Sequence, residues 1–265
     1  MSTLWAGDQV SYDYFLAAQA KAHEMLARGG VSHEQYQPEL LQKQGSVGVV
    51  NVQGTMINGS AGIMSIFGMT GYSDVGRAAI AALSDPDIKS ILLNVDTPGG
   101  QVAGLHDMAT MLADIGKIKP VITYAGGNML SAGMWLGAAG EKIYASATSE
   151  VGSIGVLMVL QDRSEAMAQA GIKPEVFRSG PFKALGNPYE KMSPEARAVI
   201  QQSVDDTAEV FLNHVASQRG VAPLVADSRY GQGRTFVGKR AKEVGLVDEI
   251  ASADYAFAYA QSQGW

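Results

Sequence analysis

The sequence has no cysteine and is poor in charged residues. Of its 265 residues, 17% are charged and 8% are aromatic. Without cysteine the chain can form neither disulfides nor thiolate ligands for zinc or iron–sulfur clusters, and it has no cysteine nucleophile. The formal net charge of −6 argues against a basic face that would bind nucleic acid through its phosphates, so no nucleic-acid partner is expected.

Long hydrophobic runs are also missing. The most apolar stretches, residues 46–52 and 88–95, are far shorter than the roughly 20 residues of a membrane span. The N-terminal residues have neither a basic region nor a long apolar run, so no signal peptide is recognisable. We therefore expect an intracellular, cytoplasmic protein without a membrane span. The histidines are scattered along the chain, and neither a metal site nor a cofactor is expected: His23, His33, His106 and His214.

Short runs rich in β-branched residues alternate with amphipathic stretches. A helix is expected over Tyr12–Arg28 and a polar linker over Val31–Gly45. Strands are expected at 47–52, 90–95, 121–125 and 142–145, and helices at 73–83, 102–115 and 130–139. This alternation predicts the α/β class, with βαβ units and a mostly parallel sheet. We divide the chain into a helical arm with its linker, residues 1–45, and a main domain, residues 46–265.

Two further segments carry expectations about surfaces. The stretch Pro194–Arg219 is predicted to be a long helix with one buried apolar face, made of Ala196, Val199, Ile200, Val204, Ala208, Phe211 and Val215. The Gly- and Met-rich stretch Asn58–Gly71 is predicted to be a mobile apolar loop. It is either plain connecting structure or the lip of a groove or a subunit contact.

Two predicted strand-to-helix turns have features of a catalytic site. The turn Asp96–Gln101 (DTPGGQ) combines a proline with two glycines, which can leave backbone N–H groups exposed to an oxyanion. In the next unit, Ser131 begins a helix beside Ala132 and Gly133, where the helix dipole favours developing negative charge. Taken alone, the two patterns are more typical of an ordinary turn and a helix cap.

A nucleophilic serine needs a base, and no histidine lies between Ser131 and His214. Lys183 is instead flanked by Phe182, Ala184 and Leu185, apolar neighbours that can disfavour a charged ammonium group. The pattern alone leaves a solvated loop lysine as the commoner alternative.

The ordered motifs resemble those of the signal peptide peptidase A family of serine peptidases, which includes the head maturation proteases of tailed phages. They are TPGG from Thr97, MLSAGMW from Met129, VGSIGV from Val151, SGPFKALG from Ser179 and GRTFVGKRAKEVGLVDEI from Gly233. The resemblance spans about residues 46–252. It implies a Clp-protease/crotonase-like spiral of βαβ units and identifies residues 46–265 as a peptidase domain.

The resemblance also implies roles for individual residues. Ser131 would be the nucleophile and Lys183, buried and uncharged, its general base. The Ser153 hydroxyl would orient that lysine. The backbone N–H groups of Gly100 and Ala132 would form the oxyanion hole.

The family further implies protein or peptide substrates and a homo-oligomer with active sites near subunit interfaces, with Lys183 crossing such an interface. Because no N-terminal anchor is recognisable, the phage branch is expected. Its substrates would be scaffold and capsid precursors in the host cytoplasm or within the prohead. The alternatives are a cytoplasmic bacterial signal-peptide-peptidase-like protease, a crotonase-type acyl-CoA enzyme, and a catalytically idle structural subunit.

Overall fold

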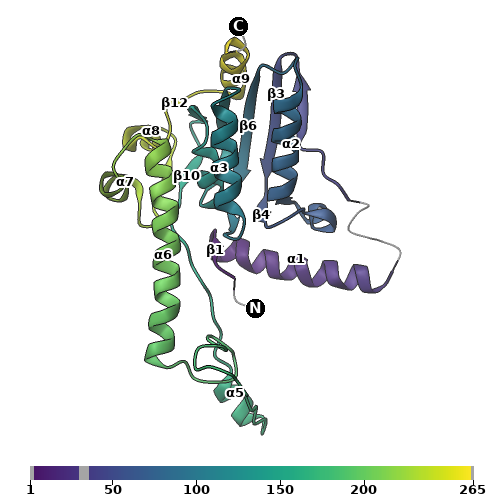
Figure 1. The fold of residues 1–265 in the computed structure, drawn as a ribbon, viewed down its shortest axis with the longest axis vertical. Helices are drawn as coiled ribbons and strands as arrows, with labels where there is room; N and C mark the ends of the chain where they lie inside the picture. The colour runs from purple at the N-terminus through teal and green to yellow at the C-terminus, as the bar shows by residue number, and fades with distance from the viewer. Residues whose placement is uncertain (1–2, 30–35, 264–265) are drawn as a thin grey trace.

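The structure, a computed structural model, describes residues 3–29 and 36–263. Its centre is a sheet in the order β11-β10-β8-β6-β3-β2, and β9 also pairs with β8 and β12. The strands are β2 (Leu41–Gln44), β3 (Val47–Gln53), β6 (Ser90–Thr97), β8 (Val121–Leu130), β9 (Lys142–Ala145), β10 (Glu150–Gly152), β11 (Thr235–Val237) and β12 (Glu249–Ile250). Figure 1 shows β3 and β6 side by side, with β10 and β12 on the side of helix α6 (Pro194–Gln218).

Parallel pairing dominates this sheet. Strands β3, β6 and β8 run parallel, with Val47 opposite Ser90 and Ile91 opposite Val121, and β9 and β10 are parallel to β8. Among the described strands of this sheet, only the outer strands β2 and β11 pair antiparallel. The α/β class and the mostly parallel sheet of the expected fold are therefore confirmed.

Helices cover both faces of the sheet. The larger core lies between one face and helices α2 (Tyr72–Ser84), α3 (Leu105–Gly116) and α4 (Ala132–Gly137). Helix α9 (Ala253–Ser262) packs Ala256 and Ala260 on the other face. Helices α7 (Pro223–Tyr230) and α8 (Lys239–Val244) follow the long α6 (Pro194–Gln218). Each predicted strand and helix of the main domain is present. The ends differ by at most three residues, except that β8 continues five residues further than predicted, to Leu130.

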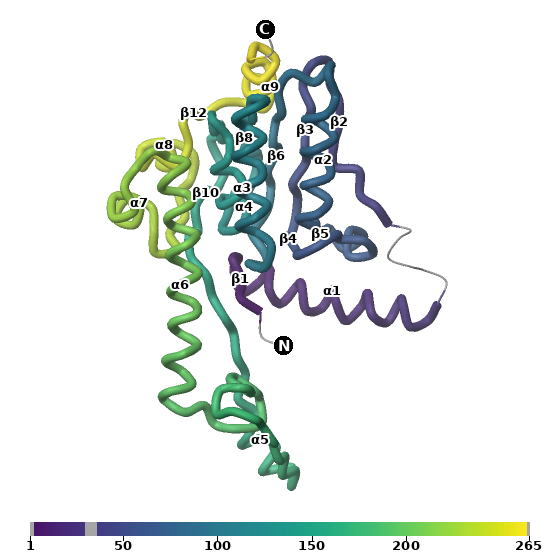
Figure 2. The backbone as a smooth tube through the Cα atoms, in the orientation of Figure 1, coloured from purple at the N-terminus to yellow at the C-terminus, as the bar shows by residue number. Residues whose placement is uncertain are grey.

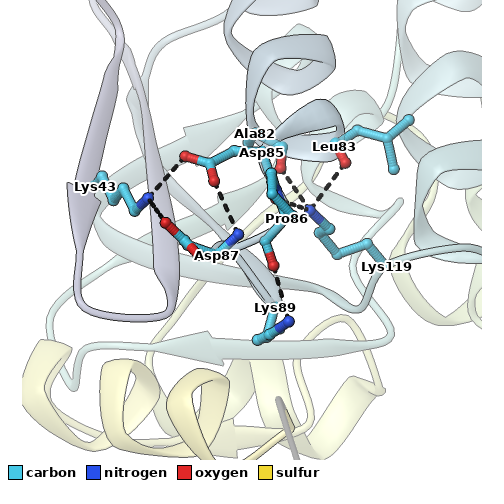
Figure 3. Close-up of polar contacts among 8 residues, drawn as sticks. All are labelled: Lys43, Ala82, Leu83, Asp85, Pro86, Asp87, Lys89 and Lys119. Carbon is cyan, nitrogen blue, oxygen red and sulfur yellow. Dashed lines mark hydrogen bonds and ion pairs between the residues drawn. The ribbon is translucent and has the colours of Figure 1, made fainter.

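Lysine side chains tie the C-terminal end of α2 to its surroundings (Figure 3). The Lys119 Nζ donates to the carbonyls of Ala82 and Leu83, at 2.7 and 2.9 Å, where the helix dipole favours positive charge. Lys43 on β2 forms ion pairs with Asp85 and Asp87 at 2.9 and 3.0 Å. These contacts fix the turn that leads from α2 into β6.

A second, small sheet lies beside the carboxyl ends of the central strands. Its order is β1-β7-β4-β5, with bounds Trp5–Ala6, Gly100–Gln101, Thr55–Ile57 and Met69–Gly71. Helix α1 (Gln9–Ala27) packs on a 3-10 helix, η2 (Gly62–Phe67), in a separate apolar cluster. The helix predicted at Tyr12–Arg28 is therefore confirmed, and it begins three residues earlier.

Two local predictions were wrong. Residues 41–44, expected to be linker, form the edge strand β2, because their backbone completes a ladder with β3. The linker residues 31–35 lie outside the described part of the chain, and the division at residue 45 stays a prediction. The segment Asn58–Gly71 is not a loop but contains η2 and β5. Its residues Ala61 and Ile63 are fully buried beneath α1.

The third difference concerns α6 and the lobe at its end. The chain leaves β10, runs along α6, forms a small lobe with α5 (Ser164–Gln169), and returns through α6 (Figure 2). Of the predicted apolar face of α6, only Phe211 and Val215 are buried, and Val199 is 40% exposed. The buried face thus extends over the C-terminal part of α6 alone, because the N-terminal part projects beyond the sheet. Among the described residues, no helix combines the length and apolar character needed to cross a bilayer.

Candidate active site

Ser131 lies between the end of β8 and the start of α4 in a strained conformation. Its φ and ψ are 51° and −112°, a region that L-residues rarely adopt. Such a backbone costs on the order of 1–3 kcal/mol and persists where the surroundings enforce it, often at active sites. A serine on a sharp strand-to-helix turn is typical of a nucleophile that presents its hydroxyl to substrate.

Hydrogen bonds on both sides enforce this turn. The Ser131 N–H donates to the Gly152 carbonyl at 2.8 Å, and the Ser131 carbonyl accepts from the Trp135 N–H at 2.9 Å. The Ser131 Oγ lies 3.5 Å from the Gly155 carbonyl oxygen, a long contact that leaves the hydroxyl weakly held. The residue is only 1% exposed.

The TPGG turn packs directly against the turn of Ser131. Thr97 Oγ1 donates to the Gly54 carbonyl at 2.6 Å and accepts from the Gly99 N–H at 3.1 Å, which shapes the turn. A side chain at Gly133 would collide with the Thr97 methyl group, so glycine permits this approach. Helix α4 also contacts β7, which contains Gly100. The two predicted oxyanion-hole residues, Gly100 and Ala132, thus lie on segments that meet beside Ser131.

Ser153 occupies the corresponding position on the neighbouring strand. Gly152 pairs with Leu130, so Ser153 and Ser131 are the next residues on adjacent parallel strands. Ser153 also has positive φ, 54°, and its N–H donates to the Arg234 carbonyl at 2.7 Å. The structure therefore brings four of the five predicted residues together at the carboxyl ends of the sheet strands.

Lys183 is the exception. It is exposed and lies in the lobe between α5 and α6, so the burial that we expect for an uncharged lysine is not found within one chain. Helix α6 is anchored to the body at Phe211, which stacks on Trp135 of α4 with ring centroids 4.3 Å apart. At 1.5 Å per residue, the lobe end of the helix at Pro194 is about 25 Å from that anchor.

The anchor of α6 contains a histidine pair. His214 on α6 and His106 on α3 have ring centroids 5.7 Å apart, and His214 also lies beside Trp135. Burial, and secondarily the nearby His106, lowers the pKa of His214 to about 4. His214 is therefore a neutral packing residue behind the site. In the part of the chain that the structure describes, no three potential ligands cluster to hold a metal ion.

Comparison with known proteins identifies the family of the chain. The profile of "Peptidase family S49" matches residues 113–265, more than half of the chain and including Ser131, Ser153 and Lys183. The chain belongs to peptidase family S49, a family of serine peptidases. The predicted resemblance is confirmed at this level.

Relatives of the S49 chain include two phage proteins. The chain is 32% identical over 247 residues to "Capsid assembly protease C" of Escherichia phage lambda, covering 93% of this chain and 55% of the relative. It is 34% identical over 211 residues to "Head-tail preconnector protein GP5" of Enterobacteria phage P21, covering 79% and 42%. The chain thus spans about half the length of these curated relatives.

Solved structures that align with this chain include a putative enoyl-CoA hydratase/isomerase from Acinetobacter baumannii. That likeness covers 86% of this chain and 81% of the other, with 18% sequence identity and a TM-score of 0.49.

Sequence reasoning missed one component of the site. The short strand β1 pairs with β7 and so places Trp5 and Ala6 next to Gly100. Two residues are too few to produce a strand pattern. The only available signal was the helix cap that follows, where the Asp8 side chain accepts from the Ser11 N–H at 2.7 Å.

Proposed function

We propose that this S49 chain is a serine endopeptidase that hydrolyses peptide bonds through an acyl-enzyme, with Ser131 as nucleophile and Lys183 as general base. The observation that supports it most is the strained Ser131 turn, packed between the TPGG turn and the end of β10 in a chain of this family. No other serine of the predicted motifs starts a helix beside glycine-rich backbone.

Each of these residues has a defined role in the reaction. Uncharged Lys183 accepts the Ser131 hydroxyl proton as Oγ attacks the scissile carbonyl. The backbone N–H groups of Gly100 and Ala132 stabilise the oxyanion, and the dipole of α4 adds to this. Lys183 then returns the proton to the leaving amine, and the Ser153 hydroxyl holds the lysine in place. Water hydrolyses the acyl-enzyme by the same route.

Lys183 reaches Ser131 from a second copy of the chain in this proposal. Within one chain Lys183 is exposed on the lobe, and Phe182 and Phe177 beside it are 52% and 90% exposed. Packing the lobe and the uncovered half of α6 on a neighbour would bury these apolar side chains. The same burial would disfavour a charged Lys183, as the chemistry requires.

The substrates that we propose are proteins of phage capsid assembly. The support comes from the two phage relatives, one of which is named as a capsid assembly protease. In this proposal the enzyme acts in the host cell, in the cytoplasm or within the assembling head.

The direct experiment combines an acylating serine-reactive probe with cleavage of casein as a generic substrate. Ser131→Ala should abolish labelling and lower cleavage by at least about 10³-fold. The matched control Ser228→Ala changes an exposed serine on α7 and should keep both. Lys183→Ala and Lys183→Arg should each abolish cleavage. Full labelling of Ser131→Ala would contradict the proposal. Loss of activity in Ser228→Ala would show that the effect is not particular to Ser131 and would also contradict it.

A further inference from the structure

Strand β1, Trp5–Ala6, lies beside the candidate active site. Strand β1 pairs antiparallel with β7, with Ala6 opposite Gly100 and Trp5 opposite Gln101. The Val102 N–H donates to the Leu4 carbonyl at 3.2 Å and extends this pairing by one residue. The segment therefore lies along the backbone that contains the proposed oxyanion donor Gly100.

The opposite edge of the same segment is also paired. The Trp5 N–H donates to the Leu157 carbonyl at 3.0 Å, and the Leu157 N–H donates back to the Trp5 carbonyl at 2.9 Å. Leu157 follows by two residues the Gly155 carbonyl that lies near Ser131 Oγ. The segment is thus an extended strand held on both edges by the two backbone stretches that flank Ser131.

Ala6 is fully buried in this arrangement. A side chain at Gly99 would collide with the Ala6 carbonyl oxygen, so that carbonyl is pressed against the TPGG turn. Ala6 is 0% exposed and Ser131 is 1% exposed. The next residues, Gly7 and Asp8, line a cavity of about 630 Å³ together with Ser153 and Gly155. The chain therefore runs across the site and leaves it on the side of Ser153.

Trp5 anchors the strand. Its ring is 0% exposed and packs on Tyr12 and Phe15 of α1 with ring centroids 5.3 Å away in each case. Its Nε1 donates to Ser11 Oγ at 3.2 Å. Because α1 itself packs on η2, the arm holds the strand in place through a large apolar contact.

We propose that residues 4–7 are an internal ligand of the peptide groove, which they fill as a substrate strand would. An extended peptide that adds to exposed backbone edges gains its affinity from main-chain hydrogen bonds, as this segment does on both sides. Ala6 takes the position of the residue whose carbonyl the nucleophile attacks. A protein substrate must displace the segment before it can bind. The inference rests on the proposed function of the site.

The position of Lys183 explains why the segment can occupy the groove without being cleaved. Cleavage of the peptide bond after Ala6 requires a base beside Ser131. In the single chain, Lys183 lies in the lobe at the other end of α6. The segment is therefore held in the groove without being cut, and an unassembled chain has a closed site.

The first test measures docking and needs no catalysis. Because the chain has no cysteine, Ala6→Cys introduces a single thiol at the buried position. Maleimide should label it at least about 10-fold more slowly than Val10→Cys, whose position in the same arm is 76% exposed. Adding Phe15→Ala, which loosens the anchor without altering the strand, should speed labelling of Ala6→Cys. Equal rates for the two thiols would overturn the proposal.

The second test asks whether the docked segment blocks peptide binding. The probe is a fluorescent peptide with the sequence of residues 3–7, and the protein is the full chain with Ser131→Ala. Adding Trp5→Asp should tighten binding at least about 10-fold. The apparent affinity equals the intrinsic affinity multiplied by the fraction of open sites, and this variant should raise that fraction. Val10→Asp is the matched control and should change nothing.

Phe15→Ala serves as a second release variant, and thermal melting verifies that each protein is folded. Slow thiol labelling combined with unchanged peptide binding in both folded release variants would show a structural strand outside the groove and overturn the proposal. Neither readout depends on Ser131 chemistry, so a failure of the proposed activity is seen separately, in the labelling and cleavage experiments.

Discussion

At the scale of single residues, the strain at Ser131 is the clearest sign of function. A side chain with φ of 51° is retained where glycine would be easier to accommodate. Evolution of stability alone would favour glycine at such a position, and the hydroxyl is what glycine lacks. The same reasoning applies to Ser153, with φ of 54°.

This strain predicts that the serine at position 131 lowers the stability of the fold while it is required for activity. Ser131→Gly relieves the positive φ, whereas Ser131→Ala keeps it, so the glycine variant should be the more stable by about 1 kcal/mol. Both variants should be inactive. Urea unfolding of the two proteins measures the difference, and a glycine variant that is the less stable by a similar amount would show that the turn is unstrained.

His214 predicts a pH dependence of stability. Its pKa of about 4 in the folded chain lies below the ordinary value near 6.5, so the unfolded state takes up a proton first as the pH falls. The free energy of unfolding should therefore decline between about pH 6.5 and 4, by about 1–2 kcal/mol after allowance for its partial exposure.

His214→Gln should flatten that decline. Urea unfolding at pH 7 and pH 4.5 makes the comparison for both proteins. An unchanged pH slope in the variant would assign the acid sensitivity to other groups.

At the scale of elements, α6 connects the two halves of the proposed site. In its C-terminal part, Phe211 stacks on Trp135 of α4, the short helix that follows Ser131. Its N-terminal part carries the lobe with Lys183. The position of the lobe relative to the body therefore depends on this one aromatic contact and its neighbours.

Phe211→Ala should loosen α6 at its anchor. Removing a fully buried phenylalanine typically costs about 3–5 kcal/mol. Val210→Ala changes the adjacent residue, which is 44% exposed, and should cost far less. Thermal unfolding of the two variants tests this, and similar losses in both would contradict the role of the stack.

The elements of the sheet could be predicted from the sequence because their signals are local. Short apolar runs marked β3, β6 and β8, and the amphipathic pattern over Pro194–Arg219 marked α6. Ser131 and Gly100 could be singled out because they lie in the MLSAGMW and TPGG motifs, and their roles were implied by the family resemblance of those motifs.

What the sequence could not show depends on contacts between distant segments. The apolar spacing of α6 is the same in its buried and its exposed part, so periodicity alone cannot say which part the body covers. The strand β1 has only two residues and forms because Gly100 and Leu157 offer it partners. The exposure of Lys183 in the single chain could not be predicted for the same reason. In the proposed function its contact is with Ser131 of a second copy, and a sequence pattern does not show contacts between copies.

At the scale of the whole molecule, the chain has two features that a second copy would resolve. The lobe and the projecting half of α6 expose apolar side chains, and Lys183, the proposed base for Ser131, lies exposed on that lobe. A heterologous contact, in which the lobe of one copy meets the body of the next, would address both, and it closes into a ring when the rotation between copies completes a circle. The chain would then become active only when it assembles, because assembly brings Lys183 to Ser131. Before assembly, β1 would occupy the site.

Mixing two inactive variants tests this central claim most directly. Ser131→Ala and Lys183→Ala should each be inactive alone. In an equal mixture of exchanging subunits, one site in four combines an intact serine with an intact lysine from its neighbour, so about a quarter of the wild-type cleavage rate should return. Mass spectrometry of the intact assembly verifies that the subunits exchange. Exchange without any recovery of cleavage would contradict the account.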